Sequence, residues 1–230
     1  MGYRRTPFAE GEWYHCYGRG IDKRTVFESQ KEFERFIELL YLANDTKPID
    51  RASMRNLSHT EILQLARENP LVSIGAYCLM GNHFHLLLQE KTPGGISKFM
   101  HKVGTGYTKY FNLKHERNGN LFTKPFKSKH VSDDRYFKRV VSYIHLNPAE
   151  LVEKDWKQGH VNNLAFLKNK VLTYPYASTI DFSKSVATPR IEAAILDVET
   201  ILMLKEAMPQ INASIDDALA YYQELPKEFQ

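Results

Sequence analysis

Cysteine is scarce in this sequence of 230 residues, which contains only Cys16 and Cys78. Two cysteines cannot build a disulfide framework or a cysteine zinc knuckle, and both lie in stretches that read as strands. We therefore expect both thiols to be buried apolar side chains in a reducing compartment.

Long apolar runs are also missing, since none approaches the roughly 18 residues that a membrane-spanning helix requires. The opening residues, MGYRRTPFAEGEW, lack the apolar core of a signal peptide. Internal repeats and low-complexity segments are absent as well. The composition, 43% hydrophobic and 25% charged, is ordinary for a soluble protein. We expect a cytoplasmic protein without a membrane partner, built as one fairly large domain or one domain with an appendage.

Charge is present in both signs but is unevenly distributed along the chain. Residues 98–140 hold eleven Lys or Arg against three acids, whereas residues 191–230 hold two Lys against eight acids. A basic middle predicts a polyanionic partner there and a different role for the acidic tail. A solvated charged surface is the alternative explanation.

Hydrophobic periodicity predicts an order of elements along the chain. Strand patterns cover 12–20, the hairpin 71–90 with its Gly81-Asn82 turn, and 121–131. Helical patterns cover 29–43, 58–69 and 96–111, and the second of these begins with a Ser-x-x-Glu capping box. A further helix is expected after Ser132, its N-cap, and it should end at Pro148. Acidic helical segments follow at 191–208 and 214–224. The order predicts an α+β fold, an antiparallel sheet with helices packed on it and a helical C-terminal extension.

His83 and His85 lie one residue apart in the apolar stretch LMGNHFHLLLQE. Side chains alternate along a strand, so both imidazoles point to one face, about 7 Å apart at Cβ, while Phe84, Leu86 and Leu88 face the core. Such a pair can converge on one metal ion. Two hydrogen-bonded strand histidines without a ligand are the alternative.

Tyr136, Val140, Tyr143 and Asn147 form one stripe on the helix DRYFKRVVSYIHLN. The core stripe of Phe137, Val141 and Ile144 lies beside it. A phenol and a carboxamide one turn apart can reach the same point in space. An ordinary tyrosine at the edge of the core, with Asn147 capping the helix, explains the same pattern.

Six segments in this order resemble the HUH single-tyrosine transposases, and especially the REP-associated tyrosine transposases with their IS200-like domain. The segments are YHCYGRGIDKRTVF, AYCLMGNHFHLLLQ, ISKFMHKVGTGYTKYFN, GNLFTKPFKSKHV, YFKRVVSYIHLNPAELV and, more weakly, YPYAS, which together span about residues 13–180. Many family members have proline where this chain has Gly81. The segment 44–70 is longer than the usual link between helix and strand, and the acidic tail beyond 190 matches nothing in the family, so neither inherits a role.

The resemblance implies a ferredoxin-like or RRM-like catalytic domain over 1–152, with an insertion at about 44–70, and a mostly helical, acidic extension over 153–230. It implies Tyr143 as nucleophile and His83, His85 and Asn147 as ligands of Mg²⁺ or Mn²⁺. Tyr143 would displace a 3′ hydroxyl and leave a 5′-phosphotyrosine link, with no nucleotide cofactor. Relatives act as monomers or homodimers.

Single-stranded or hairpin DNA is the partner that this resemblance implies, and the basic middle suits it. Tyr107, Tyr110 and Phe122 are candidate platforms for unpaired bases. The acidic tail is not expected to contribute. The expected DNA-contacting cations are Arg19, by resemblance to a strand-end motif, and Lys98, Lys102, Lys109, Lys124, Lys127, Lys129 and Arg139.

Two other functions fit the same residues. A domesticated, non-catalytic nucleic-acid binder would bind DNA without Tyr143 and form no covalent adduct. A metal-dependent nuclease would use water as nucleophile, so Tyr143→Phe would stay active and the products would carry free 5′ phosphates.

Overall fold

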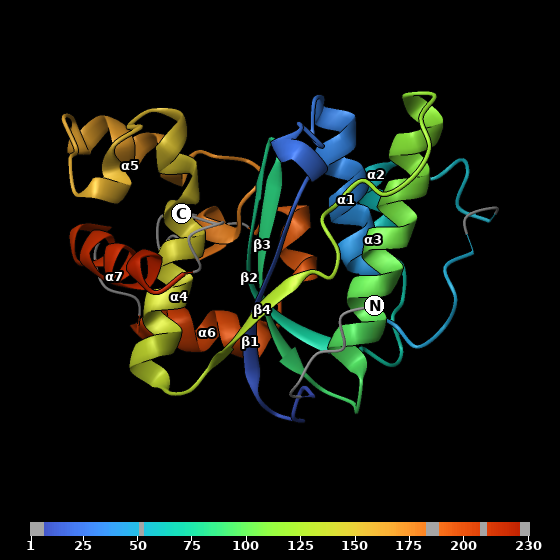
Figure 1. Ribbon diagram of the computed structural model, residues 1–230. Helices are drawn as coiled ribbons and strands as arrows, with labels where there is room; N and C mark the ends of the chain where they lie inside the picture. The colour runs from blue at the N-terminus through green and yellow to red at the C-terminus, as the bar shows by residue number, and fades with distance from the viewer. Residues whose placement is uncertain (1–6, 51–52, 183–188, 208–210, 226–230) are drawn as a thin grey trace.

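The computed structural model describes residues 7–50, 53–182, 189–207 and 211–225 (Figure 1). Its strands are β1 (Trp13–Arg19), β2 (Val72–Met80), β3 (His83–Glu90) and β4 (Lys127–Val131). Its α-helices are α1 (Gln30–Leu42), α2 (His59–Ile62), α3 (Gly95–Lys114), α4 (Asp134–Leu146), α5 (Leu164–Leu172), α6 (Val198–Ala207) and α7 (Ile211–Gln223). Short 3-10 helices are Ile21–Lys23, Asn147–Leu151, Trp156–Gln158, Ser178–Phe182 and Ile191–Ile195.

The sheet is antiparallel with the strand order β2-β3-β1-β4. With α1 between β1 and β2 and α3 between β3 and β4, this is the β-α-β-β-α-β arrangement of the ferredoxin-like fold. The predicted α+β class and the hairpin at 71–90 are therefore confirmed. In the central pair, Tyr17 lies opposite His85 and Arg19 opposite His83, so these four side chains share one face.

Helices α1 and α3 cover one face of the sheet, and the largest part of the apolar core lies beneath them (Figure 1). Phe36 of α1 contacts the rings of Phe84, Tyr107 and Phe122 at centroid distances of 5.1, 5.1 and 6.3 Å. Helix α1 begins at a capping box in which the Glu32 carboxylate accepts from the Ser29 backbone N–H at 3.0 Å.

Helix α4 covers the opposite face of the sheet, and α7 lies along α4 on the side away from α1 and α3 (Figure 1). Asp133 starts α4 by accepting from the Tyr136 N–H at 2.8 Å. The chain leaves α4 at Asn147, where Pro148 follows. This second layer carries the residues that the sequence singled out for chemistry.

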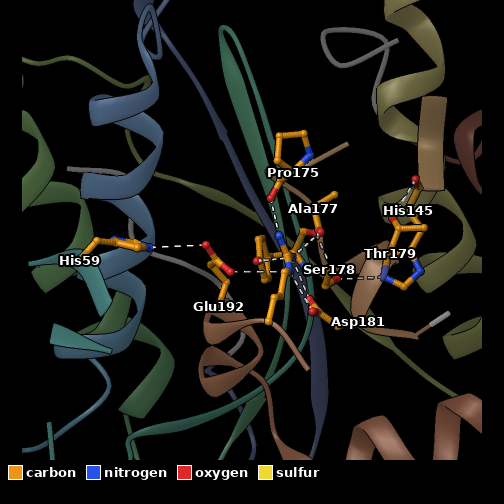
Figure 2. A network of polar contacts seen from close by, with 10 residues as sticks. His59, His145, Pro175, Ala177, Ser178, Thr179, Asp181 and Glu192 are labelled. Atoms are coloured by element: carbon orange, nitrogen blue, oxygen red, sulfur yellow. Dashed lines mark hydrogen bonds and ion pairs between the residues drawn. The ribbon is translucent and has the colours of Figure 1, made fainter. Parts of the chain in front are cut away.

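The segment after α5 runs along the free edge of β2 (Figure 2). Leu79 donates its backbone N–H to the carbonyl of Tyr176 at 2.9 Å. The Ser178 hydroxyl accepts from the Tyr77 N–H at 2.9 Å and contacts the Nε2 of His145 on α4 at 2.9 Å. The edge strand is thereby protected from pairing with another chain.

Ion pairs of Arg190 join the same segment to the rest of the molecule, and Figure 2 labels the acidic partners Asp181 and Glu192. Arg190 donates to both carboxylate oxygens of Asp181 at 2.8 Å. Its neighbour Glu192 lies 3.7 Å from His59, whose other ring nitrogen lies 3.3 Å from Glu38. These carboxylates, Glu192 first, raise the pKa of His59 to about 9.

Cys16 and Cys78 are both buried, as predicted. None of the helices within the described ranges is long and apolar enough to cross a membrane.

Several element boundaries differ from the sequence prediction, and the causes are local. The strand expected over 121–131 is only Lys127–Val131, because Pro125 has no N–H to donate to a ladder. Asp133, not Ser132, is the N-cap of α4, and the Ser132 hydroxyl donates to the Asp133 carboxylate instead.

Two further expected helices also differ from the prediction. The helix expected over 58–69 is the single turn α2, after which Arg67 stacks 3.9 Å from the Tyr41 ring centroid. The helix expected over 191–208 is divided, because Asp197 caps a new start by accepting from the Thr200 N–H at 3.0 Å. Residue 208 lies outside the described residues.

Candidate active site on the second face of the sheet

His83 and His85 both point from β3 toward α4, as strand alternation predicts. Their ring centroids lie 5.1 Å apart, with the ring planes nearly perpendicular. Both are buried, at 4% and 3% exposure. Burial lowers the pKa of His83 to about 4 and that of His85 well below its usual value, so both are neutral at pH 7.

Two amide side chains aim their oxygens at the nitrogens of His83. Asn82 donates its amide N–H to the Lys23 carbonyl at 3.2 Å, which turns its oxygen toward His83 Nδ1 at 2.6 Å. Asn147 donates to the Tyr143 carbonyl at 2.9 Å, which turns its oxygen toward His83 Nε2 at 3.3 Å. A neutral imidazole carries one proton, and we assign it to Nδ1, because that nitrogen makes the short contact with the Asn82 oxygen.

The His83 Nε2 lone pair then faces the Asn147 oxygen without a proton between them. Two ligand atoms of one ion, each bonded at about 2.1 Å, lie on the order of 3 Å apart. The separation of 3.3 Å therefore fits a shared cation. Within the described ranges no cluster of three or more His, Cys, Asp or Glu suits a metal, so a site here depends on the amide oxygen as well as the imidazoles.

Tyr143 and Asn147 come from α4 one turn apart, as the sequence predicts, and meet the histidines. The Tyr143 ring centroid lies 5.3 Å from that of His85, with the rings perpendicular. Burial raises the pKa of the Tyr143 phenol, and Asn147 opposes that shift. The alternative of a tyrosine at the edge of the core does not describe Tyr143, because only 1% of this residue is exposed.

Helix α7 is what buries Tyr143. The Tyr221 ring lies 5.2 Å and the Tyr222 ring 6.3 Å from the ring of Tyr143. Contacts of this kind, between residues far apart in the chain, leave no periodic signal in the sequence. The acidic tail therefore folds onto the candidate site.

His15 on β1 is a third imidazole in the site, and sequence reasoning missed it. Its Nε2 lies 2.9 Å from His85 Nδ1, and its Nδ1 lies 2.6 Å from the Tyr221 hydroxyl. Burial, followed by the charge of Lys129, lowers the pKa of His15 to about 3. The sequence analysis did not predict the order of the strands in the sheet. The pairing of β1 with β3 places His15 and Tyr17 on the same face as His85.

The expected DNA-contacting cations are divided between the two layers of the molecule. Arg19 and Lys127 lie on β1 and β4 at the face of the histidines. Lys129 and Arg139 lie on that side too, but pair with α7. Lys129 contacts Glu224 at 3.0 Å and Arg139 lies 3.7 Å from it.

The remaining four expected cations belong to the opposite side of the sheet. Lys98 and Lys109 are exposed on α3. Lys102 donates to the carbonyls of Asp45 and Lys47 at 2.5 and 2.7 Å and so fastens the loop after α1. Lys124 lines a cavity of about 440 Å³ between α3 and the segment before β4. The expected cations therefore do not form one continuous basic face.

The three aromatic candidates for base stacking lie on this opposite side as well. Tyr107 is wholly buried and donates its hydroxyl to the Val26 carbonyl at 2.5 Å, so it is a core residue and not a stacking platform. Phe122 is a largely buried wall of the same cavity. Tyr110 is half-buried, with the Arg35 guanidinium 5.7 Å from its ring.

Comparison with known proteins gives one family and one structural likeness. The family model described as "Transposase IS200 like" matches residues 42–147, which include both histidines of β3, Tyr143 and Asn147. A solved structure of a REP-associated tyrosine transposase bound to a REP hairpin has a TM-score of 0.49 and 14% sequence identity, over 84% of this chain and 90% of that one. No curated protein matches the sequence.

Proposed function

We propose that this chain, whose residues 42–147 match the family model of the IS200-like transposases, cleaves and rejoins DNA strands through a covalent link to Tyr143. One observation carries the proposal. The phenol of Tyr143, two neutral imidazoles and the Asn147 carboxamide converge from β3 and α4 on one point of the sheet face. These are the groups that a tyrosine nucleophile at a metal-assisted phosphodiester requires.

His83, His85 and Asn147 are the residues that would hold a divalent cation. The two facing acceptors, His83 Nε2 and the Asn147 oxygen, support this assignment. Bound there, Mg²⁺ or Mn²⁺ would withdraw charge from the scissile phosphate and stabilise the phenolate of Tyr143. Two nitrogen ligands and one oxygen ligand also suit Zn²⁺, Ni²⁺ or Co²⁺.

Tyr143 supplies the nucleophile of the reaction. Its phenolic oxygen, after losing its proton to solvent, attacks phosphorus in line with the P–O3′ bond. That bond breaks, the 3′ oxygen leaves and takes up a proton, and a 5′-phosphotyrosine link forms. A second 3′ hydroxyl reverses the same exchange, because the phosphoester is retained and no nucleotide cofactor is needed.

Arg19 and Lys127 are the cations that the proposal assigns to the strand near Tyr143. Both lie on the histidine-bearing face, and Arg19 lies opposite His83 in the β1–β3 register. A DNA strand that follows these positions would reach the candidate metal site at the N-terminal end of β3. Single-stranded or hairpin DNA fits this layout, because an unpaired strand can bend into a site between a sheet and a helix.

The proposal is tested by trapping the covalent adduct. The protein is incubated with Mn²⁺ or Mg²⁺ and a pool of 3′-labelled single-stranded oligonucleotides that contain hairpins with varied flanks. A labelled band that survives denaturant is expected for the wild type, because the label stays on the fragment joined to tyrosine. Tyr143→Phe should abolish the band while DNA and metal binding remain, since only one hydroxyl is lost.

Tyr136→Phe, on the same helix, is the matched control and should keep the band. A band that maps to Tyr107, Tyr110 or Tyr136 would show that the nucleophile was misassigned. Cleavage without any adduct would favour a nuclease that uses water. Binding of the pool without cleavage would favour a non-catalytic DNA binder.

A further inference from the structure

A hydrogen-bonded chain leaves the candidate metal site through His15 and ends on the C-terminal helix. His85 Nδ1 lies 2.9 Å from His15 Nε2, and His15 Nδ1 lies 2.6 Å from the Tyr221 hydroxyl. His15 is wholly buried at 0% exposure. The Tyr17 ring lies 4.7 Å from the His15 ring and 5.7 Å from the His85 ring, which limits the rotation of both imidazoles.

Two proton orders are compatible with this chain. In the first, His85 Nδ1–H donates to His15 Nε2, and His15 Nδ1–H donates to the Tyr221 oxygen. In the second, the Tyr221 hydroxyl donates to His15 Nδ1, and His15 Nε2–H donates to His85 Nδ1. Each neutral imidazole has one proton and one lone pair, so the order at one end fixes the order at the other.

The two orders differ in what His85 offers to a cation. The first leaves a lone pair on Nε2, the nitrogen not used by His15, and is competent to bind metal. The second puts the proton on Nε2 and blocks coordination. Metal-ligating histidines generally donate their other N–H to an acceptor, which fixes the tautomer and raises the basicity of the ligand.

We propose that His15 is a positioning residue that holds His85 in the metal-binding tautomer, and that Tyr221 of α7 supplies the terminal acceptor of the chain. The metal-ligation part of this inference rests on the function proposed above. The C-terminal extension then prepares the metal site in the DNA-free protein, because the hydroxyl that completes the hydrogen-bonded chain comes from α7 and not from the sheet.

The tautomer can be measured without metal or DNA, by ¹⁵N NMR of the imidazole nitrogens in labelled full-length protein. In the wild type, His85 should carry its proton on Nδ1. His15→Gln places an amide oxygen near the position of the lost Nε2 and should retain that tautomer. His15→Asn places its amide near the lost Nδ1 only, so His85 loses its acceptor and should shift toward the Nε2–H tautomer.

Metal affinity is the second readout, measured by Mn²⁺ titration of the same proteins. We expect His15→Asn to lower the affinity about 10–100-fold, as loss of an outer partner of a ligand does, and His15→Gln to restore most of it. Tyr221→Phe should lower it about fivefold, the effect of one net hydrogen bond. Tyr107→Phe, which removes a buried hydroxyl on the other face, should leave it unchanged.

Circular dichroism identifies any variant that fails to fold, and the two amide variants are compared only if both fold. If one does not, the inference is decided by the His85 tautomer of the wild type and by the Mn²⁺ affinity of Tyr221→Phe. A wild-type His85 with its proton on Nε2, or the same tautomer in both amide variants, would overturn the inference. If the wild type binds no Mn²⁺, the metal part of the proposed function fails, whereas the NMR comparison still decides the role of His15.

Discussion

The two faces of the sheet are built from different materials. The face under α1 and α3 is closed by aromatic and aliphatic side chains, with Phe36 at the centre of four other rings. The face under α4 and α7 contains three imidazoles, a carboxamide and several phenols, all removed from water. An apolar core loses stability when a substitution changes the volume of a side chain. A buried polar layer loses stability when a donor or an acceptor loses its partner. Stability and chemistry are thus assigned to opposite sides of the same four strands.

The largest expected effect is on the apolar face. Phe36→Ala should lower the free energy of unfolding by about 3–5 kcal/mol, because it leaves a cavity among rings that cannot close on it. Phe166→Ala is the control, since that ring is 46% exposed and its loss should cost under about 0.5 kcal/mol. Urea denaturation measures both. A loss below 1 kcal/mol at Phe36 would mean that this face is not the source of stability.

On the polar face, the expected loss is in ligand binding and not in folding. The double variant His83→Ala/His85→Ala should lose the Mn²⁺ site, with affinity falling at least about 100-fold, in a domain that still folds. His130→Ala removes an exposed imidazole from β4 and should retain the site. Equal Mn²⁺ binding by the wild type and the double variant would remove the metal hypothesis.

Charge on the two layers can be compared through the salt dependence of DNA binding. Each phosphate contact that is lost should reduce the slope of log affinity against log salt by about 0.7 for a single strand. Arg19→Gln/Lys127→Gln should therefore reduce the slope by about 1.4, measured with single-stranded oligonucleotides. Lys98→Gln/Lys109→Gln on α3 should leave it nearly unchanged. The opposite ranking would place the DNA on the α3 side.

The smallest effect concerns His59, which links α2 to the C-terminal segment through Glu192. Its pKa is raised in the folded protein from 6.5 to about 9, so its contribution to stability is complete below pH 6.5 and disappears as pH rises through about 9. His59→Gln should lower Tm by roughly 2–4 °C at pH 6, about 1 kcal/mol, and by almost nothing at pH 10. A difference that is constant with pH would show that His59 contributes by packing alone.

Local patterns in the sequence predicted the hairpin, α1, α3 and α4, and they placed His83 with His85 and Tyr143 with Asn147. These relations depend on periods of 2 and 3.6 residues, which short windows of sequence contain. The contact between His15 and Tyr221 joins residues 206 positions apart, and no periodicity encodes it. The division of the lysines between layers was missed for a related reason. Helical periodicity shows which side of α3 is apolar but not which face of the sheet α3 covers.

Tyr143 lies beneath a segment of its own chain, and this has a thermodynamic consequence. Helix α7 is a tethered ligand of the surface that a DNA strand would use, and Glu224 occupies two of its cations, Lys129 and Arg139. Under the proposed function, a DNA strand would react with Tyr143 only in the fraction of molecules in which α7 has left that residue, so the apparent affinity of the strand would be its intrinsic affinity multiplied by that fraction. The free energy of opening one helix would therefore raise the DNA concentration at which the phenol is reached by the same factor for every strand.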